Sequence, residues 1–294
     1  MTQFHGIFPY LVSPVDQTKG TILEASLRRL VEHLISCGVH GLSPLGSTGE
    51  YAYLSQTQRN EIVRITVDQT AGRIPVIAGV AGFSTADACH QAEQYAQLGV
   101  DGMVLISQKM YPLSETAQAS YFRTIAEAFP EKSMTIYTNP GLLGDVLPIS
   151  LFNELSYIPN IEYIKDASSN TGRLLTMINT FSERVKIFSA SAHIPLLVLK
   201  LGGVGWMAGP ACVLPKQCVE LYELATKGDF DVALAKQKEM WQINEAFTKY
   251  SLASCIKASL NIQGFEVGSP ILPQEPLNEA AMNDLRQIIA RLDW

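Results

Sequence analysis

A lysine lies at the end of an alternating apolar run in the stretch NIEYIKDASSN. The residues from Ile161 onward read as a buried strand, and Lys165 and Asp166 end it. Because an isolated charge is costly to bury, a lysine at the tip of a core strand either reaches water or is held there for its chemistry. Asp166 should point to the opposite face, since adjacent strand residues alternate, and we do not count it as catalytic.

The chemistry open to such a lysine is attack on a carbonyl carbon to form a Schiff base. At an ordinary pKa near 10.4, only about one lysine in 2,500 is neutral at pH 7, and a desolvated site raises that fraction by lowering the pKa. A 2-oxo acid would place its ketone against Lys165. The protonated imine would then make the neighbouring carbon acidic or a carbon–carbon bond cleavable.

The segment PLGSTGE offers a place for the carboxylate of such a substrate. Gly46 and Gly49 would let the backbone turn tightly, while Ser47 and Thr48 supply hydroxyls beside freed backbone N–H groups. An alternative interpretation is that Ser47 and Glu50 form a capping box for a following helix.

Two further segments contain groups that could act on protons. Tyr137 in IYTNPG is either a core tyrosine with a satisfied hydroxyl or a proton relay beside the lysine. The segment FSASAH ends with His193, and none of the five histidines shows the spacing of a metal site.

Elements that could position these residues recur along the chain. Three similar segments each follow an amphipathic helical stretch: CGVHGLSPLG, LGVDGMVLIS and LGGVGWMAGP. Their first glycines, Gly38, Gly99 and Gly202, suit a helix C′ position with positive φ. A short buried strand is predicted after the second glycine of each segment. Strand-like runs occur at 7–12, 41–45, 74–79, 102–107, 134–138, 161–165, 186–190 and 204–208.

Eight strands that alternate with helices predict a parallel (β/α)8 TIM barrel over residues 1–226. An open doubly wound sheet is the alternative, but FPYLVSPVDQTKG has no G-x-G-x-x-G turn after the first strand. Residues 227–294 read as a three-helix C-terminal extension. In a barrel, the four chemically capable segments should converge at the C-terminal ends of the strands.

Composition excludes several other classes of function. The 294 residues are 47% hydrophobic and 17% charged, and 22 basic against 28 acidic residues give a net charge of −6 without a basic run, which disfavours nucleic acid. No stretch approaches the roughly 18 apolar residues of a membrane span, and the N-terminus does not resemble a signal peptide. The five cysteines lack metal spacing, so we expect reduced thiols and a cytoplasmic protein.

The segments GIFPYLVSP, PLGSTGEYAYLS, GRIPVIAGVAG, IYTNPG and YIKDASSNTGR resemble the dihydrodipicolinate synthase / N-acetylneuraminate lyase family of class I aldolases. The resemblance extends from Gly6 to the C-terminal ASLNIQGFEVGSPILP. It implies a TIM barrel in a homo-oligomer, a dimer or a dimer of dimers, with no metal or organic cofactor. The implied activity is that of a lyase or aldolase acting on pyruvate, or on a 2-oxo acid that releases it, with an aldehyde as possible partner.

The resemblance also implies roles for individual residues. Lys165 would be the Schiff-base lysine and Tyr137 the proton relay. Ser47 would join that relay, and a tyrosine from the loop SQKMYPLSE, in the place of Met110 or Tyr111, would complete it across a subunit interface. The implied substrate-binding residues are Gly46, Ser47, Thr48, Gly49 and Met207.

One departure from the family pattern concerns the second substrate. Biosynthetic dihydrodipicolinate synthases resemble Tyr-Asn-x-Pro-x-Arg, whose arginine grips a carboxylate, but this chain has Leu142 in the arginine's place. We therefore expect an acceptor other than aspartate semialdehyde. A true dihydrodipicolinate synthase with another cation, such as Lys109, is the second hypothesis, and a non-catalytic 2-oxo acid-binding barrel is the third.

Overall fold

The computed structural model describes residues 3–108 and 110–292. Contacts within the chain define two units. The first contains residues 3–5 and Ile77–Met207, and the second contains Gly6–Val76 and residues 208–292. Lys165 and Tyr137 belong to the first unit and the GSTGE turn belongs to the second.

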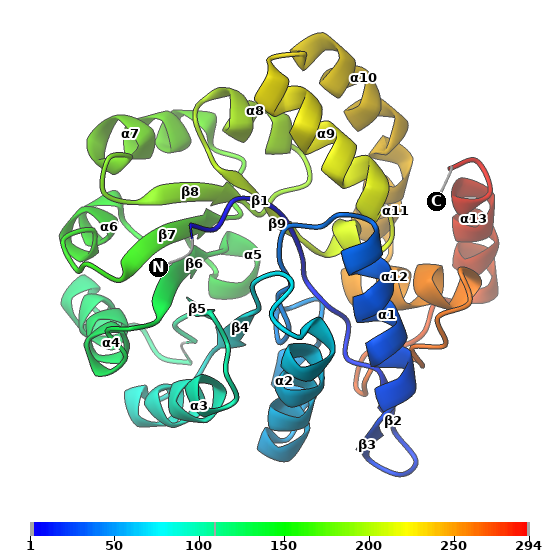
Figure 1. Cartoon of the computed structure of the whole chain (residues 1–294), viewed down its shortest axis with the longest axis horizontal. Helices are drawn as coiled ribbons and strands as arrows, with labels where there is room; N and C mark the ends of the chain where they lie inside the picture. Colours follow the sequence, from blue (N-terminus) through cyan, green and yellow to red (C-terminus); the bar gives the residue numbers. More distant parts are fainter. Residues whose placement is uncertain (1–2, 109, 293–294) are drawn as a thin grey trace. The chain divides into compact units, whose positions relative to one another are not determined.

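The first unit is built on parallel strands that follow one another as the sequence predicts. Each neighbouring pair from β4 to β9 is parallel, and the intervening segments return the chain to the same edge (Figure 1). Strands buried on both faces, as these are, are typical of parallel sheets covered by helices. The strands are β4 (Ile77–Val80), β5 (Gly102–Leu105), β6 (Ser133–Thr138), β7 (Ile161–Asp166), β8 (Lys186–Ser189) and β9 (Gly205–Ala208).

Helices α3, α4, α6 and α7 cover the outer side of these strands (Figure 1). Several begin where a side chain accepts a backbone N–H of the first turn, as Ser84 does for α3, Ser114 for α4 and Asn170 for α7. The helices of this unit are α3 (Thr85–Gln97), α4 (Glu115–Ala128), α5 (Pro140–Leu143), α6 (Ile149–Leu155), α7 (Thr171–Phe181) and α8 (Pro195–Lys200).

The second unit differs from the expected strand pattern at residues 41–45. The structure has strand β1 (Gly6–Pro9) but only isolated parallel bridges at 41–45, from Ser43 to Tyr10 and from Leu42 to Val76. The carbonyls of Pro9 and Pro75 each accept a bond in this ladder. Proline has no backbone N–H and cannot donate a hydrogen bond to the paired segment, so the ladder cannot extend through those positions.

A two-stranded antiparallel hairpin, β2 (Val15–Asp16) with β3 (Thr21–Ile22), was not expected from the sequence. The remaining elements of this unit before the C-terminal region are α1 (Glu24–Ser36), η1 (Tyr51–Tyr53), α2 (Gln56–Thr70), η2 (Gly209–Cys212) and α9 (Pro215–Lys227).

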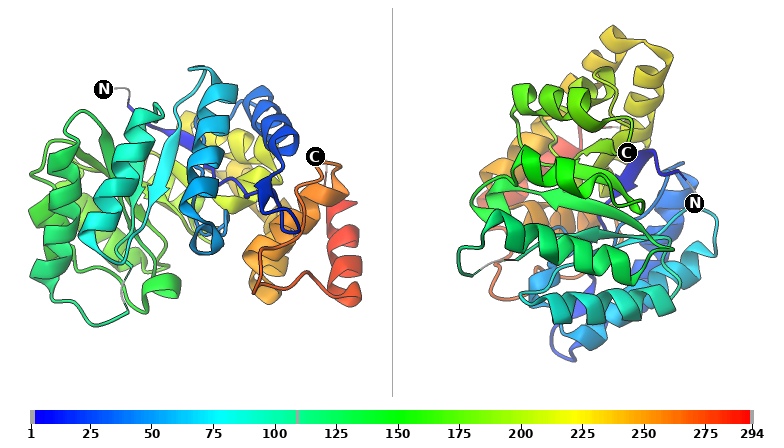
Figure 2. Two further views of the ribbon diagram at one scale, coloured as in Figure 1. Left: turned by 90° about the horizontal axis from the view of Figure 1, so that it is seen from below. Right: turned by 90° about the vertical axis from the view of Figure 1, so that its left-hand side faces the viewer.

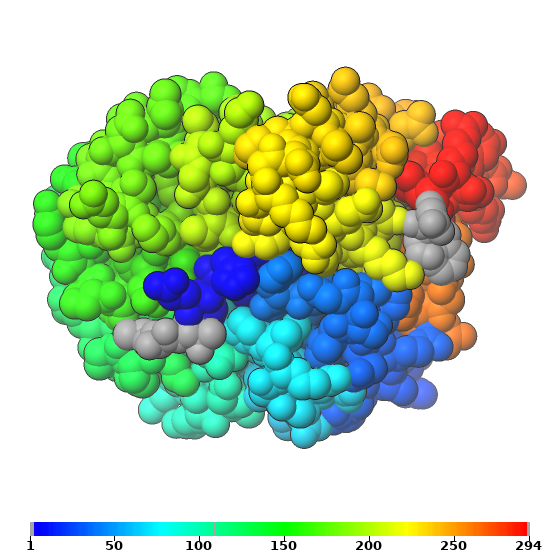
Figure 3. All heavy atoms as spheres, turned by 45° about the horizontal axis from the view of Figure 1, so that its top comes forward, coloured from blue at the N-terminus to red at the C-terminus, as the bar shows by residue number. Residues whose placement is uncertain are grey.

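The described part of residues 227–294 contains four helices, so the expectation of three is wrong. One long predicted helix is divided at Met240 into α10 (Phe230–Glu239) and α11 (Trp241–Lys249). The division lets α10 pack on α9 while α11 packs on α12 (Leu252–Ile262) and α13 (Glu279–Ile289). Figure 2 shows α12 and α13 side by side in orange and red, and Figure 3 shows α9 and α10 together in yellow.

The predicted helix-to-strand loops are confirmed. Gly38, Gly99 and Gly202 have φ of 82°, 88° and 100°, in the left-handed region where glycine alone has no steric cost.

Among the helices of the described residues, none has the length and apolar character needed to span a bilayer.

Candidate active site

Lys165 is held near the end of β7 with its side chain almost fully buried. It is 3% exposed, and its register places it between Tyr137 on β6 and Phe188 on β8. Paired residues of neighbouring parallel strands share a face, and the Lys165 Nζ lies 3.6 Å from the centroid of the Tyr137 ring. The sheet therefore brings together the two residues that the sequence predicted for imine chemistry.

Burial lowers the pKa of Lys165 well below its ordinary value of 10.5. The physical cause is desolvation, which penalises the ammonium form and leaves the neutral amine less affected. A neutral amine is the form that attacks a carbonyl carbon. Burial at the strand end therefore favours the neutral amine that the predicted imine chemistry needs at Lys165.

The Tyr137 hydroxyl is oriented by its own strand end. Asn139, two residues later, donates its Nδ2 hydrogen to the Tyr137 hydroxyl oxygen at 2.6 Å. The Asn139 Oδ1 in turn accepts the Gly141 N–H at the start of α5. Asn139 therefore fixes the position of the phenol oxygen. This contact was not predicted from the sequence, although the place of Asn139 in YTNP, two residues after the tyrosine, is a usable signal.

Asp166 faces the opposite side of β7, as predicted. It pairs with Arg173 of α7 at 3.3 Å, and both side chains are buried. Arg173 also donates to the carbonyl of Leu147 at 2.6 Å, and Asp166 accepts the Ser168 N–H. Asp166 therefore anchors the segments that follow β6 and β7, and does not point toward Lys165.

The GSTGE turn is compact, but its glycines act differently from the prediction. Positive φ occurs at the flanking Leu45 and Glu50, at 65° and 53°. Gly46 and Gly49 are needed for close approach, because a Cβ would overlap the Tyr10 ring at Gly46 and approach the Leu11 carbonyl oxygen to 2.9 Å at Gly49. Sterics, and not backbone freedom, require these two glycines.

The hydroxyls of the turn have different surroundings. Ser47 is exposed, whereas Thr48 is buried against Gly209, where an added Cβ would overlap its Oγ1. The Gly49 carbonyl accepts the hydroxyl of Ser13 at 2.6 Å. Only Ser47 presents its side chain to solvent.

The capping-box interpretation of Ser47 and Glu50 is wrong. Glu50 precedes η1 without capping it, and α2 begins later with its own box from Ser55 and Gln58. The Glu50 carboxylate instead pairs with Lys257 of α12 at 2.5 Å. One signal of this pair is present in the sequence: Lys257 is a lone cation within the apolar helix LASCIKASLNI.

The other predicted residues have different degrees of exposure. Met207 is fully buried on β9, while Tyr111 and Leu142 are 75% and 54% exposed. In FSASAH, the Ser191 hydroxyl lies 2.8 Å from Nδ1 of His193. Lys109, the alternative carboxylate grip, lies outside the described residues.

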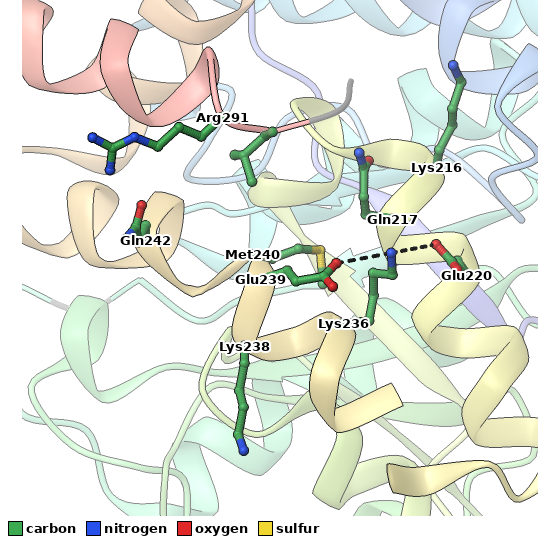
Figure 4. Close-up of a pocket in the computed structure, with 10 residues that line it drawn as sticks. Lys216, Gln217, Glu220, Lys236, Lys238, Glu239, Met240, Gln242 and Arg291 are labelled. Atoms are coloured by element: carbon green, nitrogen blue, oxygen red, sulfur yellow. Dashed lines mark ion pairs between the residues drawn. The ribbon is translucent and has the colours of Figure 1, made fainter. Parts of the chain in front are cut away.

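A pocket of about 600 Å³ lies among α9, α10, the start of α11 and the residues that follow α13. Its lysines and Arg291 do not converge, since Figure 4 shows Lys216, Lys238 and Arg291 directed away from one another. Lys236 is held between Glu220 and Glu239, each at 3.1 Å. This arrangement does not form an anion site.

Within residues 3–108 and 110–292, no three His, Cys, Asp or Glu side chains are grouped as metal ligands.

Comparisons with known proteins identify the family of this chain. The chain matches the Dihydrodipicolinate synthetase family over residues 3–292. A 4-hydroxy-tetrahydrodipicolinate synthase of Methanospirillum hungatei is 30% identical over 292 residues, 99% of this chain and 100% of the relative.

Solved structures extend the similarity to the fold. A putative dihydrodipicolinate synthetase from Pseudomonas aeruginosa superposes with a TM-score of 0.94 at 27% identity, covering 99% of both chains. A prophage protein of Escherichia coli K12, solved in complex with pyruvate, gives 0.92 at 26% identity, again covering 99% of both. These similarities confirm the predicted α/β TIM-barrel class. The chain belongs to the dihydrodipicolinate synthetase family and is a lyase of the class I, pyruvate-dependent aldolase type.

Proposed function

We propose that Lys165 forms the imine with pyruvate, or with a larger 2-oxo acid that is cleaved to pyruvate. The observation that carries this assignment is a lysine buried at a strand end, with its pKa well below 10.5 and its Nζ 3.6 Å from the Tyr137 ring centroid. Tyr137 relays protons during formation and breakdown of the imine. The bond from Asn139 holds the phenol oxygen for that role.

The Ser47 to Gly49 turn binds the carboxylate of the 2-oxo acid in this proposal. Its support is the close packing of Gly46 and Gly49 and the exposed hydroxyl of Ser47. Ser47 also takes part in proton relay, and Thr48 fixes the turn from its buried side. Met207 contributes apolar contact to the substrate.

In this proposal the partner aldehyde has no carboxylate that must be bound by a cationic side chain. Leu142, on α5 after Tyr137, is an exposed apolar side chain and offers no donor to an anion. The second candidate is condensation of pyruvate with aspartate semialdehyde. The relative in Methanospirillum hungatei, named 4-hydroxy-tetrahydrodipicolinate synthase, favours that activity.

Assembly and location are further parts of the proposal. Met110 and Tyr111 are 74% and 75% exposed on the loop after β5, and such adjacent apolar side chains are typical of a surface covered by a partner. We expect a homo-oligomer, a dimer or a homotetramer, in which Tyr111 enters the relay of another subunit. The five free cysteines favour a cytoplasmic location.

Borohydride reduction in the presence of pyruvate tests the imine. The expected result is one pyruvate adduct, mapped by peptide mass spectrometry to Lys165. A turnover screen of aldehydes and sugar acids must accompany it, because a non-catalytic binding barrel could also form an imine. An adduct without turnover on any acceptor would support the binding barrel, and aspartate semialdehyde as the best acceptor would support the second candidate.

A further inference from the structure

The turn that holds Ser47 and Thr48 is tied to a distant part of the sequence through Glu50. The Glu50 Oε1 accepts the backbone N–H of Ile271 at 2.6 Å and the Nε2 hydrogen of Gln274 at 2.8 Å. Its Oε2 pairs with the Lys257 Nζ at 2.5 Å. One carboxylate therefore joins the turn to α12 and to the segment that follows it.

The backbone of Glu50 has a steric cost that its side-chain bonds can offset. Its φ of 53° lies in the left-handed region, which glycine would adopt without that cost. The side chain is fully buried, and a buried carboxylate is costly without partners such as these.

Lys257 is equally enclosed at the other end of the pair. Its side chain is 0% exposed on α12, and its Nζ also donates to the carbonyl of Ser269 at 2.9 Å. The ammonium therefore binds the turn, through Glu50, and the 269–274 segment at once.

Helix α12 and the turn also pack against the same residue, Gly209. Ile256, the residue before Lys257, lies with Thr48 against Gly209, where an added Cβ would overlap both side chains. Thr48 and α12 therefore share Gly209 as a packing partner, in addition to the ion pair between Glu50 and Lys257.

We propose that Lys257 is a positioning residue for substrate binding: through Glu50 it fixes the backbone that presents Ser47 to the substrate carboxylate and keeps Thr48 packed on the buried side of the turn. This inference rests on the proposed function of the turn. It makes helix α12 a part of the 2-oxo acid site that never touches the substrate.

The test is a pyruvate titration of borohydride trapping at Lys165, with thermal unfolding measured on the same samples. Lys257→Met should raise the pyruvate concentration for half-maximal trapping roughly tenfold, within the about 5- to 150-fold range of coupled sites. The rate of trapping at saturating pyruvate should change little, because the lysine and its surroundings on β7 are intact. Lys257→Met should also lower the melting temperature, since it leaves Glu50 buried without its ion-pair partner.

The double variant Glu50→Gln/Lys257→Met separates positioning from folding. Both buried charges are gone, so its melting temperature should recover, but its half-maximal pyruvate concentration should stay raised. Gln274→Ala, which removes one neutral donor to Glu50, should fold and raise that concentration about two- to threefold. Glu32→Gln, at an exposed ion pair with Arg73, is the matched control and should change neither quantity.

Recovery of wild-type pyruvate dependence in the double variant would show that the pair serves folding alone and would overturn the proposal. Unchanged dependence in Gln274→Ala and in folded Lys257→Met would overturn it as well. If the wild-type protein itself forms no pyruvate adduct at Lys165, the proposed function fails first. The two failures are thus distinguishable in one experiment.

Discussion

Two buried lysines in this protein have opposite surroundings. Lys165 is 3% exposed and Lys257 is 0% exposed, and burial lowers the pKa of both. At Lys165 the Nζ faces the ring of Tyr137. At Lys257 the carboxylate of Glu50 opposes the effect of burial on the pKa and favours the ammonium.

The difference shows that burial alone does not make a lysine a nucleophile. An amine that loses its proton easily can attack a carbonyl, whereas an ammonium bonded to a carboxylate and a backbone carbonyl is held charged and enclosed. Removing one partner of a buried ion pair costs about 3–5 kcal/mol, so Lys257 stabilises its surroundings and, in our proposal, acts on the substrate site only through Glu50. The function that we propose for Lys165 is one that burial makes possible.

The largest expected effect separates the two lysines by chemistry. Lys165→Met should abolish the borohydride adduct and lower turnover by roughly 10³-fold or more, as removal of a covalent group does. Lys257→Met should still give the adduct at saturating pyruvate. Mass mapping of both variants checks this, and an adduct on Lys257 in either protein would reverse the assignment.

The next effect concerns the aromatic neighbour of Lys165. Tyr137→Phe keeps the ring against the Nζ but removes the hydroxyl that Asn139 orients. Turnover should fall about 10²- to 10⁴-fold, the usual contribution of an acid–base group, while trapping of the imine falls far less. Steady-state and trapping rates are compared on one preparation. An unchanged steady-state rate would remove Tyr137 from the mechanism.

A smaller effect tests which part of the site selects the acceptor. Leu142→Arg should improve the relative use of aspartate semialdehyde roughly tenfold, because it supplies a charged donor where a carboxylate would otherwise be unpaired. Pyruvate binding should barely change, in contrast to Lys257→Met. Coupled assays with aspartate semialdehyde and an uncharged aldehyde measure the ratio, and Leu142→Met is the control. Aspartate semialdehyde as the best acceptor of the native protein would favour the biosynthetic activity.

The last effect is on stability, and its sign differs between the two lysines. Lys165→Met should stabilise the fold by about 0.5–2 kcal/mol near neutral pH, since it removes a buried group that functions at the expense of stability. Lys257→Met should destabilise it. Chemical denaturation of both variants at one pH measures the two free energies, and equal signs would contradict the comparison.

The stabilisation by Lys165→Met should also depend on pH. Between the lowered pKa of folded Lys165 and its ordinary value of 10.5, the unfolded chain binds more protons, so the wild-type protein gains stability as pH rises. The advantage of the variant should be largest below the folded-state pKa and should shrink toward pH 10.5. A difference independent of pH would show that Lys165 is not desolvated in the folded protein.

Local patterns were sufficient for most of the fold. Apolar runs, helical periodicity and glycine at the C′ position depend on neighbours in the chain, so β5 to β9 and the positive φ of Gly38, Gly99 and Gly202 were predictable. The bridges at residues 41–45 were not, because the prolines that interrupt the ladder lie on the partner segments.

The sequence by itself determined which residues are candidates for imine chemistry, since a lysine and a tyrosine at the ends of neighbouring parallel strands must share an edge of the sheet. Tertiary structure alone decided the partner of Glu50. S-x-x-E is also the pattern of a capping box, and the Ile271 N–H that Glu50 accepts lies 221 residues away. No local pattern can distinguish a glutamate that caps a helix from one that binds distant donors. The partners of Glu50 depend on which distant donors the fold places beside it, because a buried carboxylate must be paired.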